Sequence, residues 1–176
     1  LHPEFSYLPR KFKIAVTGSP QDRAASKVHD VGLNLVRNAE GELGFEVLVG
    51  GGLGRMPIIG HVIRDYVAPR DLLAYLDAIL RVYNMGGRRD NIHKARIKVL
   101  VKSVGPAKFR EMVDAEFEKS RDIAPVLTDA EIARVKAFFV PPRYESLKDE
   151  DVVTGAGNEF RNWYQRNTRK HKVAGY

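Results

Sequence analysis

Two lysines separated by one residue stand at the start of the first extended stretch, LPRKFKIAVTGS. The apolar residues Phe12, Ile14 and Val16 alternate with Lys11 and Lys13, and a period of two predicts a strand with both lysines on one face. Their side chains would leave the strand about 6.6–7 Å apart, close enough to bind one small anion between them. The alternative is an edge strand whose lysines discourage aggregation.

Glycines form the second unusual cluster. Gly50, Gly51, Gly52 and Gly54 lie within five positions, directly after an apolar stretch. Such a turn lets a bulky group approach the main chain, and its N–H groups can meet carboxylates or phosphates. It does not match a P-loop, and it lacks the spacing of a dinucleotide-binding turn followed by a helix. Nucleotide binding is therefore disfavoured, and a flexible connecting loop is the alternative.

A basic segment, RRDNIHKARIK, follows about thirty residues later. If the chain is helical from Lys94 onward, Lys94 and Lys98 lie on one helix face, where like charges repel by a few tenths of a kcal/mol. An anion facing them would relieve that repulsion. A solvated helix face is the alternative.

The elements that would position these groups alternate between extended and helical patterns. We expect a short helix over 21–29, a β-hairpin over 31–37 and 43–49, and an antiparallel meander that includes the first strand. Residues 58–67 are expected to be extended. Helices are predicted over 69–84, from 94 to about 104, over 106–120 and over 129–139, and a last helix around Phe160 and Trp163 leads into another strand. The fold class is α+β (mixed α/β), an antiparallel or mixed sheet with helices packed on it.

The composition narrows the classes of protein. The 176 residues, 44% of them hydrophobic, are enough for one packed domain or a domain with a tail. The net charge of +7 indicates an anionic partner, and the absence of cysteine removes disulfides and thiolate ligands from this chain. No apolar run approaches the roughly 18 residues of a membrane span, so we expect no membrane association and a cytoplasmic protein. The chain begins without Met, and we expect it to be an internal fragment.

Three motifs in this order resemble the sirohaem-dependent sulfite and nitrite reductases, in particular the hemoprotein (beta) component of assimilatory sulfite reductase. The motifs are LPRKFK, LVGGGLG and GGRRDNIHKARIK followed by VKSVG. The resemblance implies two pseudo-symmetric repeats around a sirohaem coupled to a [4Fe–4S] cluster, the nitrite/sulfite reductase 4Fe-4S domain-like fold. Residues 1–120 would be the first sirohaem-binding repeat, and residues 121–176 a connector helix and the start of the second.

The resemblance also implies roles for individual residues. The two lysines of LPRKFK, here Lys11 and Lys13, would contact the oxyanion substrate at the haem. No metal ligand is assigned to this chain, because the cluster cysteines belong to the second repeat. The remaining assignments, to the macrocycle and its carboxylates, are Arg10, Gly50, Gly51, Gly52, Arg89, Arg96 and Lys98.

The implied activity is the six-electron reduction of sulfite to sulfide or of nitrite to ammonia, with a flavoprotein component or ferredoxin as electron donor. We expect the isolated chain to bind no cofactor, to be inactive, and to need the remainder of its own chain. The aromatic residues of its tail favour self-association. Two other classes stay open, a basic nucleic-acid-binding module and a non-catalytic interaction domain.

Overall fold

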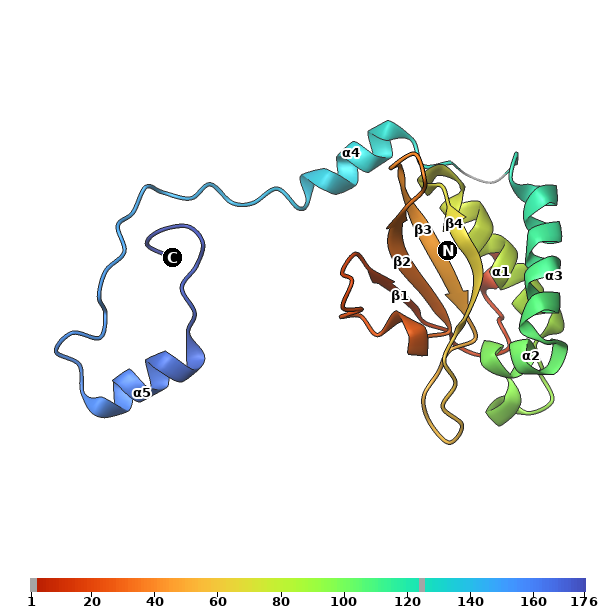
Figure 1. Cartoon of the computed structure of the whole chain (residues 1–176), viewed down its shortest axis with the longest axis horizontal. Helices are drawn as coiled ribbons and strands as arrows, with labels where there is room; N and C mark the ends of the chain where they lie inside the picture. Colours follow the sequence, from red (N-terminus) through yellow and green to blue (C-terminus); the bar gives the residue numbers. More distant parts are fainter. Residues whose placement is uncertain (1–2, 124–125) are drawn as a thin grey trace. The chain divides into compact units, whose positions relative to one another are not determined.

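The structure, a computed structural model, describes residues 3–123 and 126–176 (Figure 1). It divides into two compact units, Leu1–Thr128 and Asp129–Tyr176. The second unit contains the helices α4 (Asp129–Ala137) and α5 (Asn158–Asn167). The first unit consists, in chain order, of η1 (Pro3–Phe5), β1 (Ile14–Thr17), η2 (Ser26–Val28), β2 (Val31–Arg37), β3 (Leu43–Val49), β4 (His61–Val67), η3 (Pro69–Asp71), α1 (Leu72–Gly86), η4 (Ile92–Lys94), α2 (Ile97–Val104) and α3 (Pro106–Ser120), where η denotes a 3-10 helix.

A four-stranded sheet in the order β1-β2-β3-β4 forms the centre of the first unit. Strands β2 and β3 pair antiparallel from Val31 opposite Val49 to Arg37 opposite Leu43, with the predicted boundaries. The polar turn between them is closed by the Asn38 amide and carboxamide groups, which bond to Glu42. The hairpin and the mixed sheet are thus confirmed.

Strand β1 pairs with β2 in parallel, so the predicted antiparallel meander is wrong for the first strand. A parallel pair needs a crossover connection, and residues 18–30 provide one. The crossover packs η2 closely against β2, where Ser26 Oγ donates to Asn34 Oδ1 at 2.7 Å. Gly32 makes this possible, because a Cβ there would lie 2.6 Å from the Ser26 carbonyl oxygen.

The burial of β1 also differs from the sequence pattern. Ala15 and Thr17 are buried, whereas Ile14 and Val16 are 41% and 56% exposed. Strand β1 is at the edge of the sheet and contacts η2, which explains why its small residues rather than its large ones are covered. Because the strand begins at Ile14, Lys11 and Lys13 lie in the extended segment that leads into it.

Helices α1, α2 and α3 lie together beside the sheet (Figure 1). The predicted helices over 69–84 and 106–120 are confirmed as α1 with the preceding η3, and as α3. Each presents apolar residues at a period of about 3.6 to the interior. The core joins sheet and helices through Val31, Leu33, Val47, Val49, Ile63 and Val67 with Ala74, Tyr75, Ala78, Ile79, Val82, Tyr83, Ile97, Leu100, Val101, Phe109, Val113 and Phe117.

Two predicted helical features are wrong. In place of a helix over 21–29 only the three residues of η2 are helical, because Asp22 and Ala25 adopt left-handed backbone angles and the Asp22 carboxylate accepts the Ser26 N–H at 2.8 Å. Lys94 and Lys98 do not share a helix face, since Lys94 ends η4 and Arg96 is extended before α2 begins.

In the second unit, α4 and α5 occur close to where they were predicted, but no strand follows α5 in residues 168–176. A strand needs a partner, and the described part of this unit contains no other strand to pair with. The helix α5 stacks Phe160 on Trp163 with ring centroids 5.9 Å apart. These rings remain 43% and 54% exposed.

Candidate functional site

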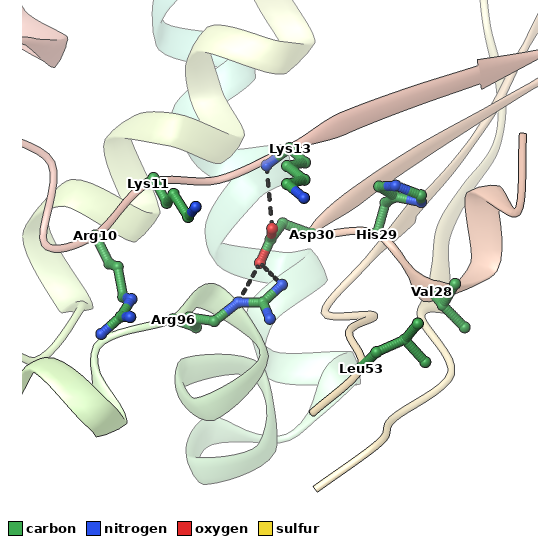
Figure 2. A pocket seen from close by; sticks show the side chains of 8 residues that line it. All are labelled: Arg10, Lys11, Lys13, Val28, His29, Asp30, Leu53 and Arg96. Atoms are coloured by element: carbon green, nitrogen blue, oxygen red, sulfur yellow. Dashed lines mark hydrogen bonds and ion pairs between the residues drawn. The ribbon is translucent and has the colours of Figure 1, made fainter. Parts of the chain in front are cut away.

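A cationic pocket of about 230 Å³ lies where the lead-in to β1 meets the start of α2. Figure 2 shows Asp30 between Lys13 and Arg96 at its centre. The four cationic side chains and one carboxylate of its wall leave a formal charge of +3 when His29 is neutral. The volume lies below the roughly 300–1,000 Å³ of pockets for drug-sized ligands, so it suits a small anion. The lining residues are Arg10, Lys11, Lys13, Val28, His29, Asp30, Leu53 and Arg96.

The two lysines differ from the other cations of the pocket in that their ammonium groups are unengaged. Both side chains are exposed, and within the described part of the chain neither Nζ makes a hydrogen bond or an ion pair. The Lys13 main chain, in contrast, is held on both sides. Its N–H donates to Asp30 Oδ2 at 3.0 Å, and its carbonyl oxygen accepts the Val31 N–H at 3.1 Å.

Arg10 is anchored at the rim. Its Nη1 donates to the Ile92 carbonyl oxygen. The buried Tyr83 of α1 lies below it, with its hydroxyl 3.1 Å from the Arg10 carbonyl oxygen and 2.8 Å from that of Ala95. One hydroxyl hydrogen serves one acceptor at a time, and burial raises the pKa of Tyr83, so the group stays a donor. Helix α1 thereby fixes the backbone on two sides of the pocket.

Arg96 and Asp30 form the central ion pair. The Arg96 Nε and Nη2 atoms both donate to Asp30 Oδ1, at 3.1 and 2.8 Å. The Asp30 side chain is 2% exposed and that of Arg96 is 29% exposed. A carboxylate this deeply buried loses its hydration, and such partners offset that cost.

The glycine turn lies beside the pocket, which its residue Leu53 lines, and its first three glycines are buried. Gly50 has φ +87°, a conformation that favours glycine. A Cβ on Gly51 would lie 2.5 Å from the carbonyl oxygens of both Lys27 and His29, and one on Gly52 would lie 3.0 Å from Arg96 Nη2. The missing side chain at Gly51 therefore lets the turn pack closely on the chain's own backbone.

Lys98 holds this turn closed through two hydrogen bonds. Its side chain is buried, and its Nζ donates to the carbonyl oxygens of Leu53 at 3.2 Å and Met56 at 2.6 Å. Burial, and after it the Arg96 guanidinium, lowers the pKa of Lys98. The ammonium closes the glycine loop and is not among the groups that line the pocket.

Arg89, the last of the predicted site residues, lies outside the pocket lining. Its guanidinium donates to the Tyr7 carbonyl oxygen at 2.8 Å and to Asn84 Oδ1 at 2.6 Å. It ties the segment before the LPRKFK motif to the end of α1. The structure thus brings Arg10, Lys11, Lys13 and Arg96 into one pocket, with the glycine turn and Lys98 behind it.

Asp30 and His29 are pocket residues that the sequence interpretation missed. His29 Nδ1 lies 2.8 Å from the Ala25 carbonyl oxygen, which places a donor proton on that nitrogen. The one sequence signal for Asp30 is an acidic residue directly before a buried strand, in a chain whose nearby motifs are basic. Its partners lie 17 and 66 residues away, beyond the reach of a local pattern.

Two further observations concern metal ligands and membrane-spanning helices. Among the residues that the structure describes, no three His, Asp or Glu side chains are grouped so that they could hold a metal ion. None of the described helices is both long and apolar enough to cross a membrane.

The first unit is an α+β domain whose mixed sheet and helices bring lysines and arginines together around one small pocket, an arrangement that suits an anion. The chain belongs to the nitrite and sulphite reductase 4Fe-4S domain family, whose model matches residues 1–121. The predicted family and fold class are confirmed.

Relatives of both substrate types are similar to this chain. A Synechococcus elongatus sulfite reductase [ferredoxin] is 40% identical over 68% of this chain, and a Leptolyngbya laminosa ferredoxin–nitrite reductase is 36% identical over 65%. The solved structure of the Mycobacterium tuberculosis NirA protein matches 66% of this chain with a TM-score of 0.61 and 36% identity. The chain spans only about a fifth of each of these proteins, namely 20%, 22% and 21%.

Proposed function

We propose that this chain contributes the oxyanion-binding part of a sulfite or nitrite reductase, with Lys11 and Lys13 as the residues that contact the substrate. The observation that carries the proposal is that some of the cations already have acceptors within the chain and others do not. Arg10, Arg96 and Lys98 donate to acceptors of the chain itself, whereas both lysine ammonium groups are free within the described residues. Charge-assisted hydrogen bonds to a small anion are the strong kind.

The lysines have a second role in this proposal. Reduction of sulfite to sulfide, or of nitrite to ammonia, consumes protons while oxygen atoms leave as water. Each ammonium group supplies N–H donors to an oxygen that must be protonated, and the remaining positive charge of the pocket favours the anion throughout. Arg96, which is held by Asp30, adds to the positive electrostatic potential of the pocket.

The cofactors of the family fit this chain to different degrees. With no cysteine, it has no thiolate to offer an iron–sulfur cluster, so cluster ligands must come from outside this chain. Arg10 and Arg96 beside the glycine turn fit the carboxylates of a sirohaem, which when bound supplies the iron that accepts electrons for the reduction. A pocket of about 230 Å³ covers only part of such a macrocycle.

It follows that the 176-residue chain alone should not turn over sulfite or nitrite. The donor in the whole enzyme would be ferredoxin or a flavoprotein component. Relatives named for ferredoxin and one Chromohalobacter salexigens relative named as the hemoprotein beta-component of an NADPH sulfite reductase support this pair of alternatives.

The test is substitution of the lysines in the intact reductase that carries this segment. Lys11→Met and Lys13→Met should each lower kcat/KM for sulfite or nitrite about ten- to a hundredfold, as expected when a charge-assisted contact of about 1.5–3 kcal/mol is lost. Thermal stability should stay within the error of the wild type. Lys102→Met, at an exposed lysine of α2 outside the pocket lining, is the matched control. Wild-type kinetics in both lysine variants would refute the proposal.

A further inference from the structure

Asp30 connects all three sequence motifs. Its carboxylate accepts the Lys13 N–H at 3.0 Å through Oδ2 and the Arg96 Nη2 at 2.8 Å through Oδ1. Its own carbonyl oxygen accepts the N–H of Gly50, the first glycine of the turn, at 3.0 Å. One buried residue therefore contacts the lysine motif, the glycine motif and the basic segment, and Figure 2 shows its contacts with Lys13 and Arg96.

The hydrogen bond to Lys13 sets the direction of its side chain. Asp30 holds the N–H of Lys13, and the next residue, Val31, holds its carbonyl oxygen. A residue whose N–H and C=O are both engaged has a fixed Cα–Cβ direction, even though it precedes the regular strand. The direction in which the Lys13 side chain leaves the backbone is thus set in part by the hydrogen bond to Asp30.

The bond to Arg96 acts on the other wall of the pocket. Arg96 is the extended residue before α2, and among the described residues its guanidinium contacts no acceptor other than Asp30. Two donors on one carboxylate oxygen restrict a planar guanidinium strongly. Without the carboxylate, the side chain would be free to rotate into the pocket or out of it.

Charge alone does not explain an aspartate at this place. A carboxylate beside Lys13 and Arg96 opposes the entry of an anion, so it lowers the electrostatic attraction of the pocket. An asparagine would fill the same volume without that cost. What the carboxylate adds is simultaneous acceptance from a guanidinium and a peptide N–H, which fixes two walls relative to each other.

We propose that Asp30 is a positioning residue that holds Lys13 and Arg96 in the geometry needed to bind an oxyanion. This inference rests on the proposed function, in which the lysines bind sulfite or nitrite. It predicts a result of opposite sign to a simple charge effect. Removing the negative charge should weaken anion binding, because lost alignment outweighs the gained attraction.

The experiment uses the 176-residue chain, sulfite as the probe and amide NMR as the readout. Asp30→Asn should raise the sulfite dissociation constant at least about tenfold, within the range for a small misplacement of a binding group. Asp30→Glu keeps the charge but moves the carboxylate, and should also weaken binding. Asp114→Asn removes an ion-paired carboxylate outside the pocket lining, which accepts from Arg64 at 3.2 Å, and should leave the constant within about twofold.

Hydrogen exchange supplies a readout that does not depend on the anion. The Lys13 amide should lose protection in Asp30→Asn, whereas the Gly50 amide, which is bonded to the backbone of Asp30, should keep it. Loss of protection at both amides would mean that Asp30→Asn unfolds the chain. The same exchange measurement on Asp30→Glu would then decide whether Asp30 positions Lys13. Unchanged or tighter sulfite binding in a folded variant overturns the inference, as does a Lys13 amide that stays protected.

The two hypotheses can fail separately. If the wild-type chain alone binds no sulfite, the kinetics of the lysine variants in the intact reductase decide the oxyanion role, and the exchange of the Lys13 amide decides whether Asp30 positions that segment. If the wild type binds sulfite and both Asp30 variants bind it equally well, the lysine proposal stands and the positioning role is refuted.

Discussion

Cations of the same formal charge differ in what they contact around the pocket. Lys98 closes a loop through two carbonyl oxygens, Arg89 ties the start of the first unit to α1, and Arg96 is paired with Asp30. Among the cations that line the pocket, Lys11 and Lys13 are the two whose charged groups make no hydrogen bond or ion pair within the described residues. A count of basic residues therefore overstates how many can bind a ligand.

At Gly51 the structure changes the reason for expecting a glycine. A side chain there would not first meet a bound macrocycle, since its Cβ would lie 2.5 Å from two backbone oxygens of the η2 segment. Gly51→Ala should lower the free energy of unfolding by about 3 kcal/mol, the upper end for overpacking, because backbone atoms yield less than side chains. Urea denaturation measures this.

Gly18→Ala is the matched control for that variant. Its Cβ would meet only Leu35 at 3.6 Å, an ordinary contact, and its backbone has no positive φ. We expect a change below about 0.5 kcal/mol there. Equal stability of the two variants would show that the turn and η2 are not packed as described.

At the scale of elements, α1, α3 and β4 are joined by a second polar network, which includes none of the motif residues. Tyr75 of α1 packs edge to face on Phe117 of α3, with ring centroids 5.3 Å apart, and its hydroxyl donates to Asp114 at 3.0 Å. Arg64 of β4 bonds to the same carboxylate at 3.2 Å. The network links the helix pair to the edge strand of the sheet.

Tyr75 should make the fold sensitive to alkali. Burial, with the Asp114 carboxylate second, raises the pKa of Tyr75 above its ordinary value of 10.0. The folded state therefore keeps the proton after the unfolded chain has lost it, so this stabilisation is complete below pH 10 and declines as the pH rises above it. The decline approaches about 1.4 kcal/mol per pH unit.

Tyr75→Phe should remove that part of the pH dependence. At neutral pH it should cost about 0.5–1.5 kcal/mol for the lost hydrogen bond, and its stability should approach that of the wild type as the pH rises above 10. Urea denaturation at neutral and at alkaline pH measures both. A constant difference between the two proteins across that range would contradict the assignment.

At the scale of the whole molecule, the two units differ in how much apolar surface they cover. The first encloses a continuous core, whereas neither α4 nor α5 has a buried residue. Phe138 and Phe139 are 76% and 80% exposed. Covering adjacent exposed aromatic rings of this size with another protein surface lowers the free energy.

We predict that the chain self-associates through the aromatic residues of its tail. Sedimentation velocity at increasing concentration should show a mass above that of the 19.8 kDa monomer. Phe138→Ser combined with Phe139→Ser should shift the distribution toward monomer, while Lys102→Met should not. A monomeric mass for the wild type at every concentration would refute this prediction.

Local sequence patterns were sufficient for the hairpin, for α1 and α3, and for the family. The alternation over residues 31–49 and the helical period over 72–86 depend on neighbours a few positions apart, so they are readable without a structure. The LPRKFK motif likewise identified Lys11 and Lys13 as an adjacent pair of cations.

The tertiary structure decided what depends on distant residues. The parallel pairing of β1 follows from the packing of η2 on Gly32, and no periodicity within β1 encodes it. Lys98, predicted to bind the cofactor, closes the glycine loop by donating to the carbonyl oxygens of Leu53 and Met56, which lie more than 40 residues away in the sequence. Asp30 shows no motif of its own, and it becomes the centre of the pocket only when folding brings Lys13 and Arg96 to its two carboxylate oxygens.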